Sequence, residues 1–395
     1  MKVTFVSNYI NHHQIPVSNA LYEALGDAYT FVQMEPMEQE RIQMGWGGAY
    51  SELPYLRLGY QQPEICQKLI LESDMVIWGG YEDDTWLQPR LQAKKPTIRY
   101  SERFYKTGLW KAVSPRGLRK KYLDHTRYRK DRVYLLCSGA YVPLDYHIVG
   151  SYPGKMFRWG YFPETRHYDV DKLLDEKASN RKNGVPEILW AARFIDWKHP
   201  EMVLELAKCL RNKGKEFHIT MIGNGPLQEE TADRVAALGL EKEITLAGSM
   251  PPDQVREAME KADIVLMTSD RNEGWGAVAN EAMNSGCVLV AGHMAGAVPF
   301  LVKDGQNGLI YGENRVEEMV EKVCQALEDR GLRERMGRQA YETIVNLWNA
   351  GEAATRLLQL CRQIAEGGEI TFWEEGPLSK APILRERRKD RSKEK

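Results

Sequence analysis

Two glutamates in the stretch NEGWGAVANEAMNSG, residues 272–286, mark a place where the chain could do chemistry. Glu273 precedes a Gly-Trp-Gly triplet, and Glu281 follows eight positions later. The glycines indicate a sharp bend or a close approach by another group. A helix predicted from Ala277 to Asn284 would bring free N–H groups and the positive end of its dipole to this bend. Such a helix start can bind an anion. The pattern therefore predicts an anion site flanked by two carboxylates that bind hydroxyl groups.

Arg193 and Lys198 are candidates to neutralise this anion. They lie five residues apart, directly after the apolar run Ile188–Ala191. A guanidinium binds phosphate as a planar fork and an ammonium binds it as a point charge. Taken alone, the two cations would be ordinary surface charges, and the two glutamates would be solvated acids at a helix start. The sequence GNG at Gly223–Gly225 is either a strand-ending turn or a backbone that approaches a ligand.

Short apolar strands alternate with amphipathic helices along most of the chain. This order predicts an α/β fold of doubly wound parallel sheets, whose ligands bind beyond the carboxyl ends of the strands. Helices are predicted at Pro16–Leu25 and Pro200–Asn212, each begun by proline. The predicted strands are Val3–Ser7, Asp74–Trp78, Val133–Cys137, Ile188–Ala191, Phe217–Gly223, Ile244–Ala247, Ile264–Thr268, Cys287–Ala291 and Gly308–Tyr311.

The polar stretch 164–184, which includes DEKASNRKNG, divides the strands into two groups. It is predicted to be a linker between Rossmann-like domains at 1–163 and 185–365. A tail follows at 366–395, and its charged end is expected to be disordered.

Composition places the chain among ordinary globular proteins. It has 395 residues, of which 43% are hydrophobic and 28% charged, and its formal net charge of -1 argues against binding to polyanions. Six cysteines without a CxxC pair favour reduced thiols over disulfides or a zinc site. The start MKVTFVSNYI does not resemble a signal peptide, and no apolar run of 18 residues follows. We expect a cytoplasmic protein.

The stretch RNEGWGAVANEAMNSGCVLVAGHMAGAVPFLVKDGQNGLIY resembles the signature region of GT-B retaining glycosyltransferases of family 4, with its E-x7-E pair. AARFIDWKHPEMVLELAKCL, IGNGPLQEE and ITLAGSMPPDQVREAMEKADIVLMTS follow the family pattern in the same order. The close resemblance runs from Ile188 to about Ile364. The first half matches loosely, because SNYINHHQIP stands where many members have a Gly-Gly loop. SNYINHHQIP, RYSERFYKTG and GKMFRWGYFPE are similar to bacterial transferases of surface-polysaccharide assembly.

This resemblance implies the GT-B fold, with an acceptor-side domain facing a nucleotide-sugar-binding domain. It implies transfer of a sugar, with retained configuration, from a nucleoside diphosphate sugar, UDP rather than GDP, to a saccharide. A lipid-linked acceptor in cell-surface glycan biosynthesis is expected. Arg193, Lys198 and Glu273 would be catalytic, and Glu281 would bind the ribose. The nucleotide-sugar-binding residues would be Gly274, Trp275, Gly276, Ala277, Glu281, Gly223, Gly225 and Ser249.

Neither a metal nor a cofactor is expected from the resemblance. The DxD at Asp169–Asp171 lies in the predicted linker, and Asp83-Asp84 is a plain pair, so both are interpreted as turn or cap carboxylates. On the acceptor side, the candidates follow the first strand and the strand-like PTIRY: His12, His13, Ser101, Glu102 and Arg103.

A basic run lies among Trp110, Leu118, Tyr122 and Tyr128. It is either a solvated helical face or, as we expect, a surface that associates peripherally with anionic membrane lipids. No RNP-type or helix-turn-helix motif accompanies it, so no nucleic-acid partner is expected. The cations are Arg116, Arg119, Lys120, Lys121, Arg127, Arg129, Lys130 and Arg132.

Other functions stay open on the same fold. A nucleotide-sugar epimerase or a phosphorylase is an alternative enzyme, although no lysine site for pyridoxal phosphate is visible. A non-catalytic nucleotide-sugar-binding subunit of a transferase complex is an alternative of another kind. Nucleotide base, donor sugar, acceptor, linkage and oligomeric state cannot be read from these residues.

Overall fold

The computed structural model describes residues 1–39, 42, 50–106, 108, 112, 114–179, 181, 184–313 and 315–385. Trp110 of the basic run and the charged end of the predicted tail, 386–395, lie outside these residues. Within them, none of the helices combines the length and the apolar character needed to cross a bilayer.

Seven parallel strands form the N-terminal sheet, in the order β3-β2-β1-β4-β5-β6-β7. Its central strands β1 and β4 are buried along their whole length, as expected for a parallel sheet covered on both faces. The strands are β1 (Val3–Ser7), β2 (Tyr29–Gln33), β3 (Leu56–Leu58), β4 (Met75–Gly79), β5 (Thr97–Ser101), β6 (Val133–Ser138) and β7 (Met156–Trp159). The helices are α1 (Ile15–Leu25), α3 (Pro63–Glu72), α4 (Gln88–Gln92), α5 (Pro115–Asp124) and α6 (Val142–Ile148).

Six parallel strands form the C-terminal sheet, in the order β10-β9-β8-β11-β12-β13. The strands are β8 (Glu187–Ala191), β9 (His218–Ile222), β10 (Ile244–Gly248), β11 (Ile264–Met267), β12 (Val288–Gly292) and β13 (Leu309–Tyr311). The helices are α8 (Pro200–Asn212), α9 (Gln228–Ala237), α10 (Pro252–Lys261), α11 (Val278–Asn284), α12 (Val298–Leu301), α13 (Val316–Glu328), α14 (Arg330–Asn346) and α15 (Ala350–Glu366).

Two doubly wound parallel sheets confirm the predicted fold class, and every predicted strand is present with its ends within about two residues. Helix α8 has the predicted bounds and buries the predicted stripe of Val203, Leu206, Ala207 and Leu210. Strands β2, β3 and β7 were not predicted. β3 has only three residues and lies at the edge of the sheet, so its alternation of apolar and polar residues is too short to recognise in the sequence.

The predicted linker, 164–184, contains a helix. Residues Val170–Ser179 form α7, which contacts α14 and α10 of the C-terminal domain. Leu173, Leu174 and Lys177 of this helix are buried, and the Lys177 ammonium donates to the backbone oxygen of Met259 at 2.7 Å. The helix therefore packs as part of the C-terminal domain, which corrects the prediction of a plain linker up to residue 184.

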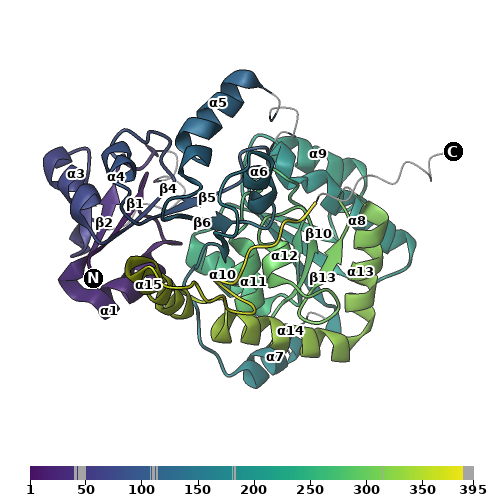
Figure 1. Ribbon diagram of the computed structural model, residues 1–395. Helices are drawn as coiled ribbons and strands as arrows, with labels where there is room; N and C mark the ends of the chain where they lie inside the picture. Colours follow the sequence, from purple (N-terminus) through teal and green to yellow (C-terminus); the bar gives the residue numbers. More distant parts are fainter. Residues whose placement is uncertain are drawn as a thin grey trace.

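The last helix crosses back to the N-terminal domain. Helix α15 packs along α1, and the two lie side by side in Figure 1. The segment after α15 then reaches β7 at the edge of the N-terminal sheet. There the backbone N–H of Arg158 donates to the oxygen of Ser379, and the N–H of Leu378 donates to the oxygen of Arg158, each at 2.8 Å. The predicted domain boundary at residue 365 is thus corrected: α15 and the segment up to 381 pack on the first domain.

Strand order reverses at one point in each sheet, between β1 and β4 and between β8 and β11. Loops diverge on either side of such a point and leave a crevice at the carboxyl ends of the strands. The carboxyl-end loops of the two sheets also meet each other. The backbone N–H of Ala140, after β6, donates to the backbone oxygen of Gly296, after β12, at 2.9 Å. Both crevices therefore open toward the contact between the domains.

Candidate functional site

Lys198 and Glu273 meet at the reversal point of the C-terminal sheet. Lys198 ends a short 3-10 helix after β8 (η7, Asp196–Lys198), and Glu273 lies in the loop after β11. Their side chains form a largely buried ion pair between Lys198 Nζ and Glu273 Oε2. Burial by itself would raise the pKa of Glu273, but the charge and hydrogen bond of Lys198, with a hydrogen bond from Ser269, lower it below its ordinary value. Glu273 is therefore a carboxylate at neutral pH.

The two loops that carry this pair are fastened to each other through their backbones. The Thr268 hydroxyl donates to the backbone oxygen of Lys198 and accepts from the indole of Trp190 at 2.8 Å. The backbone N–H of Asp270 donates to the oxygen of Trp197 at 3.0 Å. Groups held in this way lose little entropy when a ligand binds, which is the usual construction of a preorganised site.

Arg193 lies in the same loop as Lys198, and the GNG turn supports it. The Arg193 guanidinium lies over the Trp197 ring, 5.7 Å from its centroid. Gly223 and Gly225 have φ angles of 141° and 150°, and a Cβ on Gly225 would lie 2.5 Å from the backbone oxygen of Phe194. Close packing against the Arg193 loop is therefore a sufficient reason for these glycines.

The triplet Gly274-Trp275-Gly276 packs between the domains. A Cβ on Gly139, after β6, would lie 2.5 Å from the backbone oxygen of Gly274. Gly276 has a φ of 92°. Trp275 is 1% exposed, and its indole N–H donates to Asn280 at 2.8 Å. The Trp275 ring lies directly over Gly160 of the N-terminal domain, so this side chain fills the interdomain contact.

Glu281 lies in the first turn of α11, whose start at Val278 agrees with the predicted helix; Ala277 precedes it as the N-cap residue. Burial raises the pKa of the Glu281 carboxyl, and the charges of Arg256 and Arg166 partly offset this rise. Arg256 is itself held by Asn284, at 2.7 Å. Ser249, the last of the predicted nucleotide-sugar residues, is exposed after β10.

The N-terminal domain brings Glu102 against this site. Its carboxylate accepts from Lys106 at 2.7 Å and from the Tyr161 hydroxyl at 2.5 Å. Gly274 packs so closely on this carboxylate that a Cβ there would overlap it. The positive charge of Lys106 also contributes to the lowered pKa of Glu273. A pair of opposite charges from each domain therefore meets at one place.

Two further acceptor-side candidates, Arg103 and Ser101, contact groups within the N-terminal domain. Arg103 is buried, pairs with Asp145 at 3.4 Å and lies over the ring of Tyr141, so it supports the loop. The Ser101 hydroxyl donates to the backbone oxygen of Glu102 at 2.6 Å.

His12 and His13 lie after β1, with ring centroids 3.8 Å apart. His13 stacks on Tyr161, the residue that binds Glu102. Burial lowers the pKa of His12 to about 4 and that of His13 well below its usual value. Both imidazoles are therefore neutral at pH 7 and lie beside the Glu102 cluster.

One member of each acidic pair that the sequence assigned to turns or caps is used in that way. Asp169 accepts from the backbone N–H of Lys172 at the start of α7, at 3.2 Å, and Asp83 accepts from that of Thr85 at 2.9 Å. Asp84 forms an ion pair with Arg99. Within the described part of the chain, no three His, Cys, Asp or Glu side chains are grouped as metal ligands. All six cysteines are free thiols, four of them buried.

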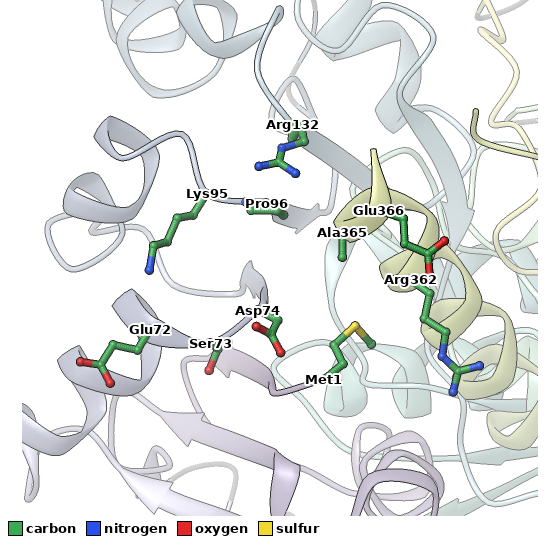
Figure 2. Close-up of a pocket in the computed structure, with 10 residues that line it drawn as sticks. All are labelled: Met1, Glu72, Ser73, Asp74, Lys95, Pro96, Arg132, Arg362, Ala365 and Glu366. Carbon is green, nitrogen blue, oxygen red and sulfur yellow. The ribbon is translucent and has the colours of Figure 1, made fainter. Parts of the chain in front are cut away.

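A separate pocket of about 410 Å³ lies at the amino ends of the strands of the N-terminal sheet and is shown in Figure 2. It is formed where β4, β5 and β6 begin and where α15 ends, and it mixes cations with acids (Lys95, Arg132, Arg362, Glu72, Asp74 and Glu366). Ligands of doubly wound sheets bind at the carboxyl edge. We therefore place the candidate site at the Lys198–Glu273 pair.

Three residues of this site were not predicted. Lys106 and Tyr161 bind Glu102, and Gly160 accommodates Trp275. Lys106 stands only four positions after Glu102, but the segment between them is not helical, so the spacing alone did not predict the pair. Tyr161 and Gly160 have no such local signal, because their partners are far away in the sequence.

Comparison with known proteins gives a family match in the C-terminal domain. Residues 171–343, which include Lys198 and Glu273, match the family model described as "Glycosyl transferases group 1", so this part of the chain is similar to that family. The alpha-D-kanosaminyltransferase of Streptomyces kanamyceticus is 26% identical over 53% of this chain and 55% of its own length. The sulfoquinovosyl transferase SQD2 of Arabidopsis thaliana is 32% identical over 60% of this chain and 45% of its own length. The chain thus spans about half the length of these curated relatives.

A solved structure extends the likeness in fold to most of the chain. The crystal structure of Anabaena HepE in complex with UDP matches 93% of this chain and 99% of its own, with a TM-score of 0.66 and 16% identity. At that identity the match concerns the fold, and it agrees with the GT-B arrangement of two facing Rossmann-like domains.

Proposed function

We propose that the chain is a retaining glycosyltransferase of the family 4 type, which transfers a sugar from a nucleoside diphosphate sugar to a saccharide. The observation that carries the proposal is the buried Lys198–Glu273 pair at the reversal point of the C-terminal sheet. It faces the Glu102–Lys106 pair of the other domain. A site with cations, carboxylates and hydroxyl donors from both domains suits a substrate that is part phosphate and part sugar.

In this proposal the cations stabilise the leaving group. Arg193 and Lys198 bind the diphosphate, and the N–H groups at 274–277 add to the positive potential. Glu273 accepts hydrogen bonds from the donor sugar, and Glu281 accepts them from the ribose. The anomeric carbon loses its bond to the phosphate oxygen and gains a bond to the acceptor oxygen on the same face. The departing phosphate takes the acceptor's proton, so this mechanism assigns no base role to the neutral His12 and His13.

UDP is our proposed donor nucleotide, and neither metal nor cofactor is part of the proposal. The Anabaena protein that shares the fold was crystallised with UDP. Base choice is tested first by thermal unfolding of the protein with UDP, GDP or ADP, in EDTA. A ligand at 100 times its Kd stabilises a protein by about 2.7 kcal/mol. We expect UDP to raise the Tm more than GDP or ADP, with no further gain when Mg²⁺ replaces EDTA.

Glu281→Gln should weaken UDP binding about tenfold, because an amide accepts hydrogen bonds from the ribose less strongly than a carboxylate. Isothermal titration calorimetry of the variant and the wild type measures this ratio. Glu328→Gln is the control, since Glu328 is exposed and pairs with Lys215 on the surface. Equal affinity of Glu281→Gln and the wild type would remove Glu281 from the ribose site.

Turnover separates the proposed enzyme from the alternatives. Purified protein should hydrolyse or transfer from the nucleotide sugar whose nucleotide stabilises it, and the first product should have the donor's anomeric configuration. Nucleotide binding without any turnover would favour a non-catalytic subunit. Conversion of one nucleotide sugar into another would favour an epimerase.

We further propose that α5 brings the protein to the anionic cytoplasmic face of a membrane, where a lipid-linked acceptor of surface-glycan assembly would be located. No side chain of α5 is buried, and Leu118 and Tyr122, 40% and 56% exposed, lie one turn apart. Arg116, Arg119 and Lys120 are exposed on the same helix. In Figure 1, α5 projects from the body of the N-terminal domain. Cations interleaved with exposed apolar side chains suit a lipid interface.

Replacing Arg116, Arg119 and Lys120 with serine should weaken binding to vesicles of anionic phospholipid by about tenfold or more, because each cation near such a surface contributes ~1 kcal/mol. Vesicle co-sedimentation at low and at physiological salt measures the loss. Serine at Lys213, Lys242 and Lys261, exposed lysines of the C-terminal domain, is the control of equal charge. If both triple variants bind vesicles as the wild type does, α5 is a solvated face.

A further inference from the structure

His199 joins the two loops that carry Lys198 and Glu273. Its Nδ1 lies 2.7 Å from Glu201 Oε1, and its Nε2 lies 3.3 Å from Asp270 Oδ2. Glu201 belongs to α8, which His199 precedes, whereas Asp270 belongs to the loop after β11. The backbone of His199 is left-handed, with φ 49° and ψ 57°, a region that is uncommon for residues other than glycine and in which histidine, asparagine and aspartate are enriched. This backbone conformation directs the ring between two carboxylates.

Asp270 connects His199 to the backbone of Glu273. Its carboxylate accepts from the backbone N–H of Asn272 at 2.8 Å, and its backbone oxygen accepts from the N–H of Glu273 at 3.1 Å. Its own N–H donates to the oxygen of Trp197. Movement of the Asp270 side chain would therefore shift the backbone that presents Glu273, and Lys198 is the residue next to His199.

From this geometry we infer that His199 is a positioning residue of the proposed transfer reaction, which holds Lys198 and Glu273 in register by linking Asp270 to the start of α8. The inference rests on the proposed function, since it concerns the same site. His199 itself contacts neither reacting group, and it acts through Asp270 and through its own backbone.

The charge of the ring suits this role. Hydrogen bonds to Asp270 and then to Glu201 raise the pKa of His199 to about 9 against the opposing effect of burial. Both ring nitrogens then donate at neutral pH. The charged groups that face the cluster are Asp270, Glu201 and Arg234 of α9, which acts on Glu201. Because the folded-state pKa is raised, the link is complete below pH 6.5 and is lost as the pH rises through about 9.

His199→Asn is the variant that tests the inference. Asparagine tolerates a left-handed backbone, so the substitution removes the charged bridge with little backbone strain. We expect UDP affinity, measured by calorimetry at pH 7, to fall about tenfold. Hydrogen exchange of the unliganded protein should also become faster in residues 195–199 and 268–274, because the loops lose their link. The pH dependence of UDP affinity between pH 7 and 9.5 should be smaller in the variant than in the wild type.

His218→Asn is the matched control. His218 also bridges two side chains, Glu187 at 2.8 Å and Thr245 at 3.0 Å. It begins β9, however, and therefore lies at the amino ends of the strands, away from the candidate site at their carboxyl ends. Asp270→Asn is the second variant, because it keeps the shape of the side chain and removes its charge. It should move the midpoint of the pH dependence toward neutral pH, which a purely structural contact would not do.

The outcomes separate this inference from the proposed function. If the wild type and His199→Asn bind UDP equally and exchange equally in both loops, the positioning role is wrong and the nucleotide site stands. If exchange accelerates in the variant while the wild type binds none of UDP, GDP and ADP, the link between the loops stands and the proposed function fails. Faster exchange in His218→Asn to the same extent in both loops would also overturn the inference.

Discussion

Glu273→Gln should lower the turnover of the proposed transfer reaction by about 100-fold or more, with a smaller change in UDP affinity. Removal of one preorganised polar group at a reacting centre costs about 10²–10³ in rate. Glu273 is a buried carboxylate paired with Lys198, so the amide also leaves the ammonium without its counter-charge. Initial rates with the nucleotide sugar whose nucleotide stabilises the wild type, together with calorimetry using UDP, measure the two effects separately.

A double substitution distinguishes chemistry from stability in this experiment. Glu273→Gln alone should lower the Tm, because an unpaired buried ammonium is unfavourable. Combining it with Lys198→Met removes both charges and should restore much of the stability without restoring turnover. If the single variant keeps the wild-type rate, Glu273 has no part in the reaction and the site must be reassigned.

Gly160→Ala should lower turnover by about 100-fold through the contact between the domains. Gly160 follows β7, and a Cβ there would overlap the Trp275 ring of the other domain. That ring has little freedom to move, since its N–H is bonded to Asn280 and it packs against Trp348 and Phe300. Overpacking costs about 1–3 kcal/mol. A displacement of about 1 Å at reacting groups can cost ~10²-fold in rate.

Small-angle X-ray scattering and initial rates measure this effect together. The expected result is a larger radius of gyration with a lower rate, while UDP binding changes little because the proposed diphosphate and ribose contacts, Arg193, Lys198 and Glu281, lie in the C-terminal domain. Gly368→Ala is the control: Gly368 has no neighbour within 4 Å of an added Cβ and is not among the glycines with positive φ. Gly160→Ala with Trp275→Phe should recover activity, since the smaller ring leaves room. Wild-type rate and size in Gly160→Ala would show that this contact does not set the geometry of the site.

Much of the C-terminal domain follows from local sequence. Apolar runs of four to seven residues were enough to predict its strands, because buried parallel strands are apolar along their whole length. Glu273, Lys198 and Arg193 could be singled out because they follow such strands, and the carboxyl ends of parallel strands meet at one edge. Their joint contact with a nucleotide sugar stays a prediction.

Less of the N-terminal domain could be predicted from the sequence. Its strands β3 and β7 are short and lie at the edges of the sheet. Glu102 belongs to the candidate site through its contacts with Tyr161 and Gly274, which are distant in the sequence. The same difficulty explains the domain boundaries. Helix α7 lies in a polar stretch but buries one face on α14, and α15 returns to α1.

The sequence by itself determined the two doubly wound sheets, the strand ends at which Arg193, Lys198 and Glu273 stand, and the carboxylates used in turns. These features depend on periodicity and on residues close together in the chain. Only the tertiary structure decided that Glu102 and Lys106 face Glu273, that Trp275 packs on Gly160 and that His199 links Asp270 to α8. The partners in those contacts are 71 positions apart for His199 and Asp270, 115 for Gly160 and Trp275, and 171 for Glu102 and Glu273, and a side chain's partner at that range is set by how the elements pack.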